Sequence, residues 1–276
     1  MVVGLESTIL QLGPLEGIFT STLELMYLIA KTFPPEFMHV YTTIWMLGII
    51  WPILILSLMG YTFRTYPNFG VYKLKQEWDS RAIMLFSLTA VLMTAAHTAG
   101  RFYYITPYQN MEMLFDSFNV VLPAMFGLPS AWGCHLAVIL MDIIVGGGGF
   151  GVWAIVGPGI NAMVGYLSWK LIGHDPALTK TSSWVRYIIL VIICLAFKGP
   201  GWGWIGSFFY GTPLAISYYI AAPVEDITVF FGAFISPFAL KAIFPIVERW
   251  GLYWKMIPGW YLEAPLGSED YKPVPD

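Results

Sequence analysis

The sequence predicts an all-α membrane protein, a polytopic transmembrane helical bundle of about six or seven spans. Of the 276 residues, 57% are hydrophobic and 11% are charged, whereas about 25% are charged in a typical soluble domain. So few charges cannot cover a surface that faces water. Four windows, at 41–63, 82–100, 184–197 and 227–247, are apolar over most or all of the roughly 20 residues that a helix needs to cross hydrocarbon.

The chain divides into three predicted parts. Residues 1–40 contain the stretch FTSTLELMYLIAKTF, which predicts an N-terminal interfacial segment or a short first span, because Glu24 at its centre is costly in lipid unless it is paired. Residues 41–250 form the transmembrane helical domain. Residues 251–276 form a polar C-terminal tail.

The stretch 120–171 leaves its own folding open. It is long enough for two long helices, three short helices, or one helix and a broken segment. Four glycines at 146–149 and Pro158 between two further glycines exclude one smooth helix. We therefore expect a broken or re-entrant segment near 146–159, and the glycines and prolines at 199–213 predict a second interruption.

The distribution of positive charge predicts the topology. Ten of the fourteen Lys and Arg residues lie in three regions, which are the loop 64–81, the stretch 170–186 and the tail from Arg249 onward. The positive-inside rule places these three regions together on the cytoplasmic face. This arrangement requires 120–171 to cross the membrane an odd number of times. No basic stripe suggests a nucleic-acid partner, and the expected surroundings are the lipid bilayer.

Ionisable residues within apolar segments are the candidates for function, because charge at membrane depth is costly. His97 and Arg101 lie one helical turn apart and are expected either to bind an anion or proton, or to be a packed histidine and an arginine that reaches the interface. His135 and Asp142 lie two turns apart, roughly 10 Å along one helix face, which is too far for one metal ion without further ligands.

Acidic residues on the predicted non-cytoplasmic side form a second set. Asp116 precedes the third segment and Glu225 and Asp226 precede the last span, so the three carboxylates could cluster. For Glu225 and Asp226 we favour, over a catalytic role, a position at a helix N-terminus, where carboxylates accept from free N–H groups. Lys198 and Lys241 also need partners at membrane depth, most simply in structural ion pairs.

No metal or cofactor site follows from these residues alone. The chain has no pair of histidines or carboxylates at metal-ligand spacing on a predicted helix. Cys134 and Cys194 lie in apolar segments without a CxxC motif, which indicates packing.

Five stretches together resemble a known family. They are GYTFRTYPNFG at 60–70, GRFYY at 100–104, FNVVLPAMFGLPSA at 118–131, VWAIVGPG at 152–159 and FFGAFISPFALKAIFPIVERW at 230–250. In this order they resemble the membrane A subunit of the copper membrane monooxygenases, the family of particulate methane and ammonia monooxygenases. The chain departs from that family at 171–225, where it has an additional apolar span.

The resemblance implies an integral subunit of a multi-subunit oxidoreductase complex in a prokaryotic inner or intracytoplasmic membrane. Such a complex oxidises methane, ammonia or a short hydrocarbon, with copper mainly in the partner subunits and this chain as a scaffold. The alternative from the residues is a transporter or channel with a midplane site at broken helices. A third class, a haem anchor that uses His97 and His135, requires the two histidines to face each other.

Overall fold

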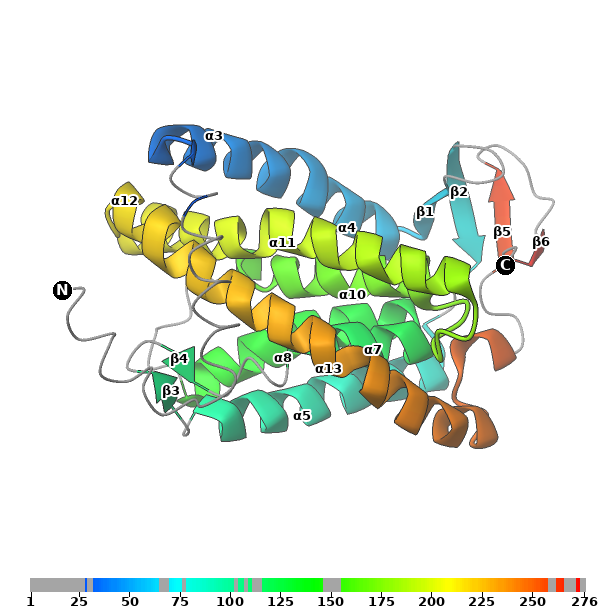
Figure 1. Cartoon of the computed structure of the whole chain (residues 1–276). Coiled ribbons are helices and arrows are strands. Elements are labelled where there is room, and N and C mark those ends of the chain that lie inside the picture. Colours follow the sequence, from blue (N-terminus) through cyan, green and yellow to red (C-terminus); the bar gives the residue numbers. More distant parts are fainter. Residues whose placement is uncertain are drawn as a thin grey trace.

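A computed structural model describes most of the chain after its N-terminal segment. The described residues are 28, 32–64, 70–75, 78–101, 104–106, 109–110, 116–145, 155–257, 262–265 and 272–273. The predicted segment 1–40 therefore lies largely outside them, as do residues 146–154 of the predicted break. In the described part, most residues belong to helices that run along a common bundle direction (Figure 1).

Four helical stretches are long and apolar enough to cross a membrane. They are Pro35–Leu58, Ser80–Gly100, Thr181–Phe209 and Leu214–Met256, and a shorter apolar helix spans Leu128–Met141. Large hydrophobic side chains such as Ile188, Phe234 and Phe238 are exposed on their outer faces. The chain is thus a helical integral membrane protein.

The helices have the following bounds: α3 (Pro35–Trp45), η2 (Met46–Ile50), α4 (Trp51–Leu58), α5 (Ser80–Arg101), α7 (Phe118–Phe126), α8 (Leu128–Val145), α10 (Gly159–Ile172), α11 (Thr181–Tyr210), α12 (Leu214–Ile216), η3 (Ser217–Ala221), α13 (Ala222–Arg249) and η4 (Trp254–Met256). The segments η2 and η3 are single π-helical turns, which occur mostly as bulges inside longer helices. Accordingly α3–η2–α4 and α12–η3–α13 are each one continuous rod.

A small sheet at one end of the bundle was not predicted. Strands β1 (Tyr61–Arg64), β2 (Gly70–Lys75), β5 (Leu262–Pro265) and β6 (Lys272–Pro273) pair in the order β1-β2-β5-β6, and all these pairings are antiparallel. A separate hairpin joins β3 (Tyr104–Thr106) to β4 (Gln109–Asn110). The predicted polar loop and the predicted tail thus supply strands beside the bundle.

This sheet brings the three basic regions to one end, as the charge distribution predicted. Pairing of β2 with β5 joins the first region to the tail. The ammonium of Lys170 lies 3.4 Å from the buried carboxylate of Glu263, which joins the second region to the tail. The hydroxyl of Tyr253 also donates to the carbonyl of Gly173 at 2.7 Å. Their common position is confirmed, and the cytoplasmic assignment of this end stays a prediction.

The predicted interruption at 199–213 is wrong for most of its length. Helix α11 continues through Pro200 to Tyr210. A proline in a helix leaves the carbonyl four residues earlier without its usual donor, and here the hydroxyl of Tyr41 donates to that carbonyl, Ala196 O, at 3.4 Å. The helix ends instead at Gly211, whose φ of 65° is left-handed and suits glycine.

The described residues of the stretch 120–171, which are 120–145 and 155–171, contain the helices α7, α8 and α10. Gly127, at φ 78°, separates α7 from α8. Helix α8 runs in the same direction as α5, because Thr89 bonds Ser130 and Thr94 bonds the carbonyl of Ala137. A turn at Gly157–Pro158 precedes α10, so the C-terminal end of the predicted break is present.

Helix α8 packs very closely on α5 at Gly133. A Cβ atom there would lie 2.6 Å from the carbonyl oxygen of Phe86 and 2.7 Å from Cβ of Thr89. Both obstacles lie on or next to the α5 backbone, so the two helices would have to separate. A glycine at this point therefore sets the distance between them.

We expect Gly133→Ala to destabilise the protein by about 1–3 kcal/mol, the usual cost of overpacking. The thermal unfolding midpoint in a fixed detergent or nanodisc measures the effect. The matched control is Gly206→Ala in α11, where a new Cβ meets only ordinary contacts at 3.5 Å or more. Equal midpoints for the two variants would contradict close packing at Gly133.

Asp175 organises the turn between α10 and α11. Its carboxylate accepts from the N–H of Thr179 at 2.8 Å, from the N–H of Lys180 at 3.0 Å, and from the hydroxyls of Thr179 and Ser183. Partial burial raises the pKa of Asp175, but these four hydrogen bonds outweigh burial and hold the pKa below its usual range.

This depressed pKa predicts a pH dependence of stability. The contribution of Asp175 is fully present above the unfolded-state pKa of about 3.9 and is lost as the pH falls through the lower folded-state pKa. We expect Asp175→Ala to cost about 1 kcal/mol at neutral pH, the usual net contribution of a hydrogen bond. The variant should also lack the decline in stability at acidic pH. Unfolding midpoints of the unaltered protein and of Asp175→Ala, measured between neutral and strongly acidic pH, test this. Asp175→Asn keeps one acceptor oxygen and should lose less stability at neutral pH than Asp175→Ala.

Candidate functional site

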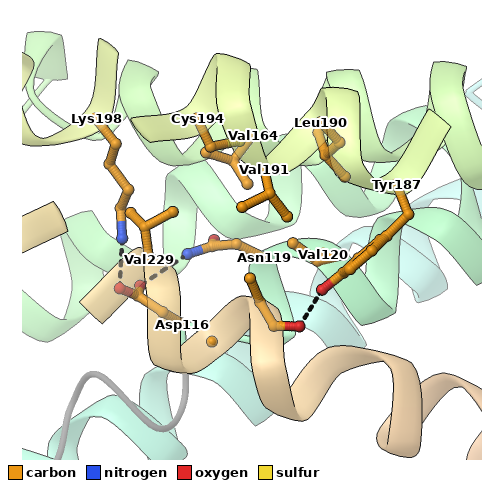
Figure 2. A pocket seen from close by; sticks show the side chains of 12 residues that line it. Asp116, Asn119, Val120, Val164, Tyr187, Leu190, Val191, Cys194, Lys198 and Val229 are labelled. Carbon is orange, nitrogen blue, oxygen red and sulfur yellow. Dashed lines mark hydrogen bonds and ion pairs between the residues drawn. The ribbon is translucent and has the colours of Figure 1, made fainter. Parts of the chain in front are cut away.

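A buried lysine joins three helical segments inside the bundle. Lys198 is the eighteenth of the thirty residues of α11, about 25 Å from the helix start at 1.5 Å per residue. Its ammonium bonds the carboxylate of Asp116, just before α7, and lies 3.0 Å from that of Glu225 in α13. Figure 2 shows Lys198 reaching from α11 toward Asp116. We call these three residues the Lys198 cluster.

Burial makes the pairing obligatory. The side chain of Lys198 is 3% exposed, against 10% for Asp116 and 21% for Glu225. A buried ammonium loses its hydration and needs opposite charge and hydrogen bonds in compensation. The hydroxyl of Thr228 also donates to Asp116 at 2.8 Å. The cluster therefore ties α11, α13 and the start of α7 together.

Gly199, next to the lysine, allows α13 to approach α11. Its N–H lies 3.1 Å from Asp226 Oδ1, which accepts from it. A Cβ at this glycine would lie 2.3 Å from that oxygen and 2.5 Å from the carbonyl of Ala222. Only a residue without a side chain fits there, so the KGPGWGW sequence serves close helix packing.

Two asparagines extend the cluster to α10. The side-chain amide of Asn119 donates to Asp116 Oδ1 at 3.1 Å and to Asn161 Oδ1 at 3.0 Å. Both asparagines are buried and lie in the first turns of α7 and α10. A polar network thus runs through α10, α7, α11 and α13 within an otherwise apolar interior.

A small cavity adjoins this network. Its volume is about 20 Å³, and α7, α10, α11 and α13 all contribute to its wall. Most of the lining is apolar, with Val120, Val164, Leu190, Val191 and Val229 among the residues. Polar groups come from Asp116, Asn119, Tyr187, Cys194 and Lys198, and Figure 2 shows these side chains gathered between the helices.

The predicted carboxylates are partly brought together. Asp116 and Glu225 share Lys198, as their expected clustering requires, and Asp226 lies beside them on Gly199. Our favoured interpretation of Glu225 and Asp226 as a helix N-terminus is wrong. Helix α13 follows η3 without a break, because the residue before it, Ala221, is itself helical.

The other predicted candidates lie elsewhere. His97 and His135 are buried, and the ring of His135 packs edge-on against Trp51 and Trp132 at centroid distances of 5.8 and 5.5 Å. Arg101 and Asp142 have helical backbones, and their side chains lie outside the described part of the chain.

Lys241 does not form the ion pair expected for it within the described residues. Its ammonium lies 5.2 Å from the centre of the Trp184 ring, a cation–π contact. Within the same described part, no group of three or more His, Cys, Asp or Glu side chains is placed to hold a metal ion.

Sequence reasoning did not identify Asn119, Asn161 or Thr228 as members of the site. One signal was available: Lys198 is an isolated cation in a long apolar stretch, so acceptors had to come from other helices.

Comparison with protein-family models, curated protein sequences and solved structures finds no match to this chain.

Removing the lysine charge should destabilise the bundle strongly. We expect Lys198→Met to cost about 3–5 kcal/mol, the usual effect of deleting one partner of a buried ion pair, because Asp116 and Glu225 lose their counter-charge. The unfolding midpoint in nanodiscs measures this. The control is Lys241→Met on the exposed face of α13, expected to cost at most about 1 kcal/mol.

A second variant separates charge from packing. Adding Asp116→Asn to Lys198→Met removes one of the two unpaired carboxylates, and we expect part of the lost stability to return. Equal losses at Lys198 and Lys241, or no recovery in the double variant, would show that the buried pair does not hold the helices.

Proposed function

We propose that this chain is the scaffold subunit of a multi-subunit membrane oxidoreductase, a copper-dependent monooxygenase that oxidises methane, ammonia or a short hydrocarbon. The observation that best supports a scaffold role is the Lys198 cluster, because its charged groups bind one another across helices. Copper then belongs mainly to partner subunits.

The helix arrangement supports the wider proposal for the membrane topology. The four long helical stretches, α8 and the two short helices α7 and α10 make seven candidate membrane segments, which is compatible with a bundle of six or seven spans. The basic end then faces the cytoplasm of a prokaryotic inner or intracytoplasmic membrane. The exposed apolar faces of the outer helices contact lipid or the other subunits.

A transporter is the second candidate, and one observation favours it. The short helices α7 and α10 meet at Asn119 and Asn161 beside buried charges, which is similar to the broken helices that form transport sites. The cavity volume argues against it. About 20 Å³ is space for roughly one water molecule and not for a larger solute.

Purification from the native membrane tests the proposal. We expect other membrane chains to co-purify with this protein and copper to follow the complex rather than the isolated chain. A metal-free protein without partners would contradict a subunit role. Substrate uptake by the isolated chain in vesicles would favour the transporter instead.

A single variant tests the scaffold role more specifically. In the native host, Lys198→Met should lower the amount of complex while the copper content per assembled complex stays unchanged, because the cluster holds helices and not metal. Lys241→Met serves as the matched control. Loss of copper from complexes that still assemble would place Lys198 in the metal site and contradict the scaffold role.

A further inference from the structure

Asn119 has one polar atom without a partner among the residues that the structure describes. Its side-chain nitrogen donates both hydrogens, to Asp116 and to Asn161. Its oxygen, Oδ1, is buried and accepts no hydrogen bond, and the residue is 1% exposed. The amide cannot be turned round, because Oδ1 would then face the carboxylate of Asp116 with no hydrogen between the two oxygens.

An unsatisfied buried acceptor is costly, so the surroundings of Asn119 should provide a donor. No donor from the described part of the chain reaches it, yet Asn119 lines the cavity between α7, α10, α11 and α13. The cavity volume is about 20 Å³, and one water molecule needs roughly 10–15 Å³ measured in this way. The space therefore fits a ligand of one heavy atom.

The lining fixes the chemistry of that ligand. Asn119 Oδ1 can only accept, so the ligand must donate. Lys198 has three N–H groups, and Asp116 and Glu225 accept from two of them, so the third can donate to a ligand that accepts. The hydroxyl of Tyr187 donates to the carbonyl of Ala233 and keeps lone pairs that can accept from the ligand.

These requirements exclude the other simple occupants. An apolar guest would leave Asn119 Oδ1 unsatisfied, and an anion without hydrogens could not donate to it. A metal cation would lie beside the ammonium of Lys198, which lines the same cavity, and like charges repel in a low-dielectric interior.

We propose that this cavity is a binding site for a single water molecule, which donates to Asn119 Oδ1 and accepts from Lys198 Nζ. The water completes the Lys198 cluster and connects α7 to α11 by a second route beside Asp116. This water site depends only on the cavity and its polar groups, whether or not the chain belongs to an oxidoreductase.

A density map of the full chain in nanodiscs, at a resolution that shows other ordered waters, tests this directly. We expect one peak within hydrogen-bonding distance of both Asn119 Oδ1 and Lys198 Nζ. An empty cavity would overturn the proposal. A peak with the short oxygen distances of a bound cation would overturn it as well.

Filling the cavity gives an independent measurement. Val229 lines the cavity, so Val229→Ile adds a methyl group where the water binds. We expect the density peak to vanish and the unfolding midpoint to fall below that of Val247→Ile. This control makes the same change at a position of α13 that is 3% exposed and away from the cavity.

The opposite result is equally clear. A dry cavity gains stability when a methyl group fills it, because packing contacts replace empty space. A midpoint for Val229→Ile equal to or above that of Val247→Ile would therefore overturn the water site. The map of the unaltered protein decides the matter even if Val229→Ile fails to fold.

Discussion

The buried charge of Lys198 constrains the rest of the bundle. An ammonium inside an apolar interior must be paired, and its partners come from a segment 82 residues earlier and from α13, after the turn that follows α11. Satisfying one lysine thus brings three distant parts of the chain to one place. Asn119 and Asn161 then orient α7 and α10 around the same carboxylate. Hydrophobic burial alone would not fix these positions, because the lipid around the bundle is as apolar as its core.

Residues without bulky side chains make this arrangement sterically possible. Gly199 lets α13 approach close enough for Asp226 to accept a backbone N–H of α11. Gly165 lies against Pro123 of α7 and Ala131 of α8, where a Cβ would come within 2.9 Å of each. Small residues at helix contacts are characteristic of membrane bundles, in which packing and interhelical hydrogen bonds replace the hydrophobic effect. The polar contacts between helices therefore require the short interhelical distances that the glycines allow.

The sequence predicts the coarse fold well because hydropathy reports directly on the solvent of each helix. Three of the four windows lie wholly within the long apolar helices, and the first overlaps α3–η2–α4, whose last predicted residues belong to β1 instead. The three basic regions meet at one end. Strand pairing between 70–75 and 262–265 could not be predicted, because short strands far apart in sequence have no periodic signal that links them.

The site shows the same division between local and non-local information. Lys198 was visible as a costly residue in an apolar segment, and Asp116 and Glu225 as acidic residues that precede predicted spans, yet which groups pair depends on helix packing. Glu225 illustrates this, since proline and two acids in a row are typical of a helix start. The preceding residues extend the helix through η3, so Glu225 lies inside a continuous helix, where its carboxylate binds Lys198. Local sequence favoured a helix N-terminus for Glu225, because its partner Lys198 lies 27 residues away in the chain.

The interior charges of this site bind one another across helices. Charged groups that serve transport or catalysis must exchange partners with a ligand, whereas Lys198, Asp116 and Glu225 already engage one another. The cavity left beside them has a volume of about 20 Å³, which is room for roughly one water molecule. Exchange of partners would break contacts that join α7, α11 and α13, so function at this cluster would require those helices to move apart. A tightly packed glycine contact at Gly199 opposes such movement, and the interior is thus built to hold its shape.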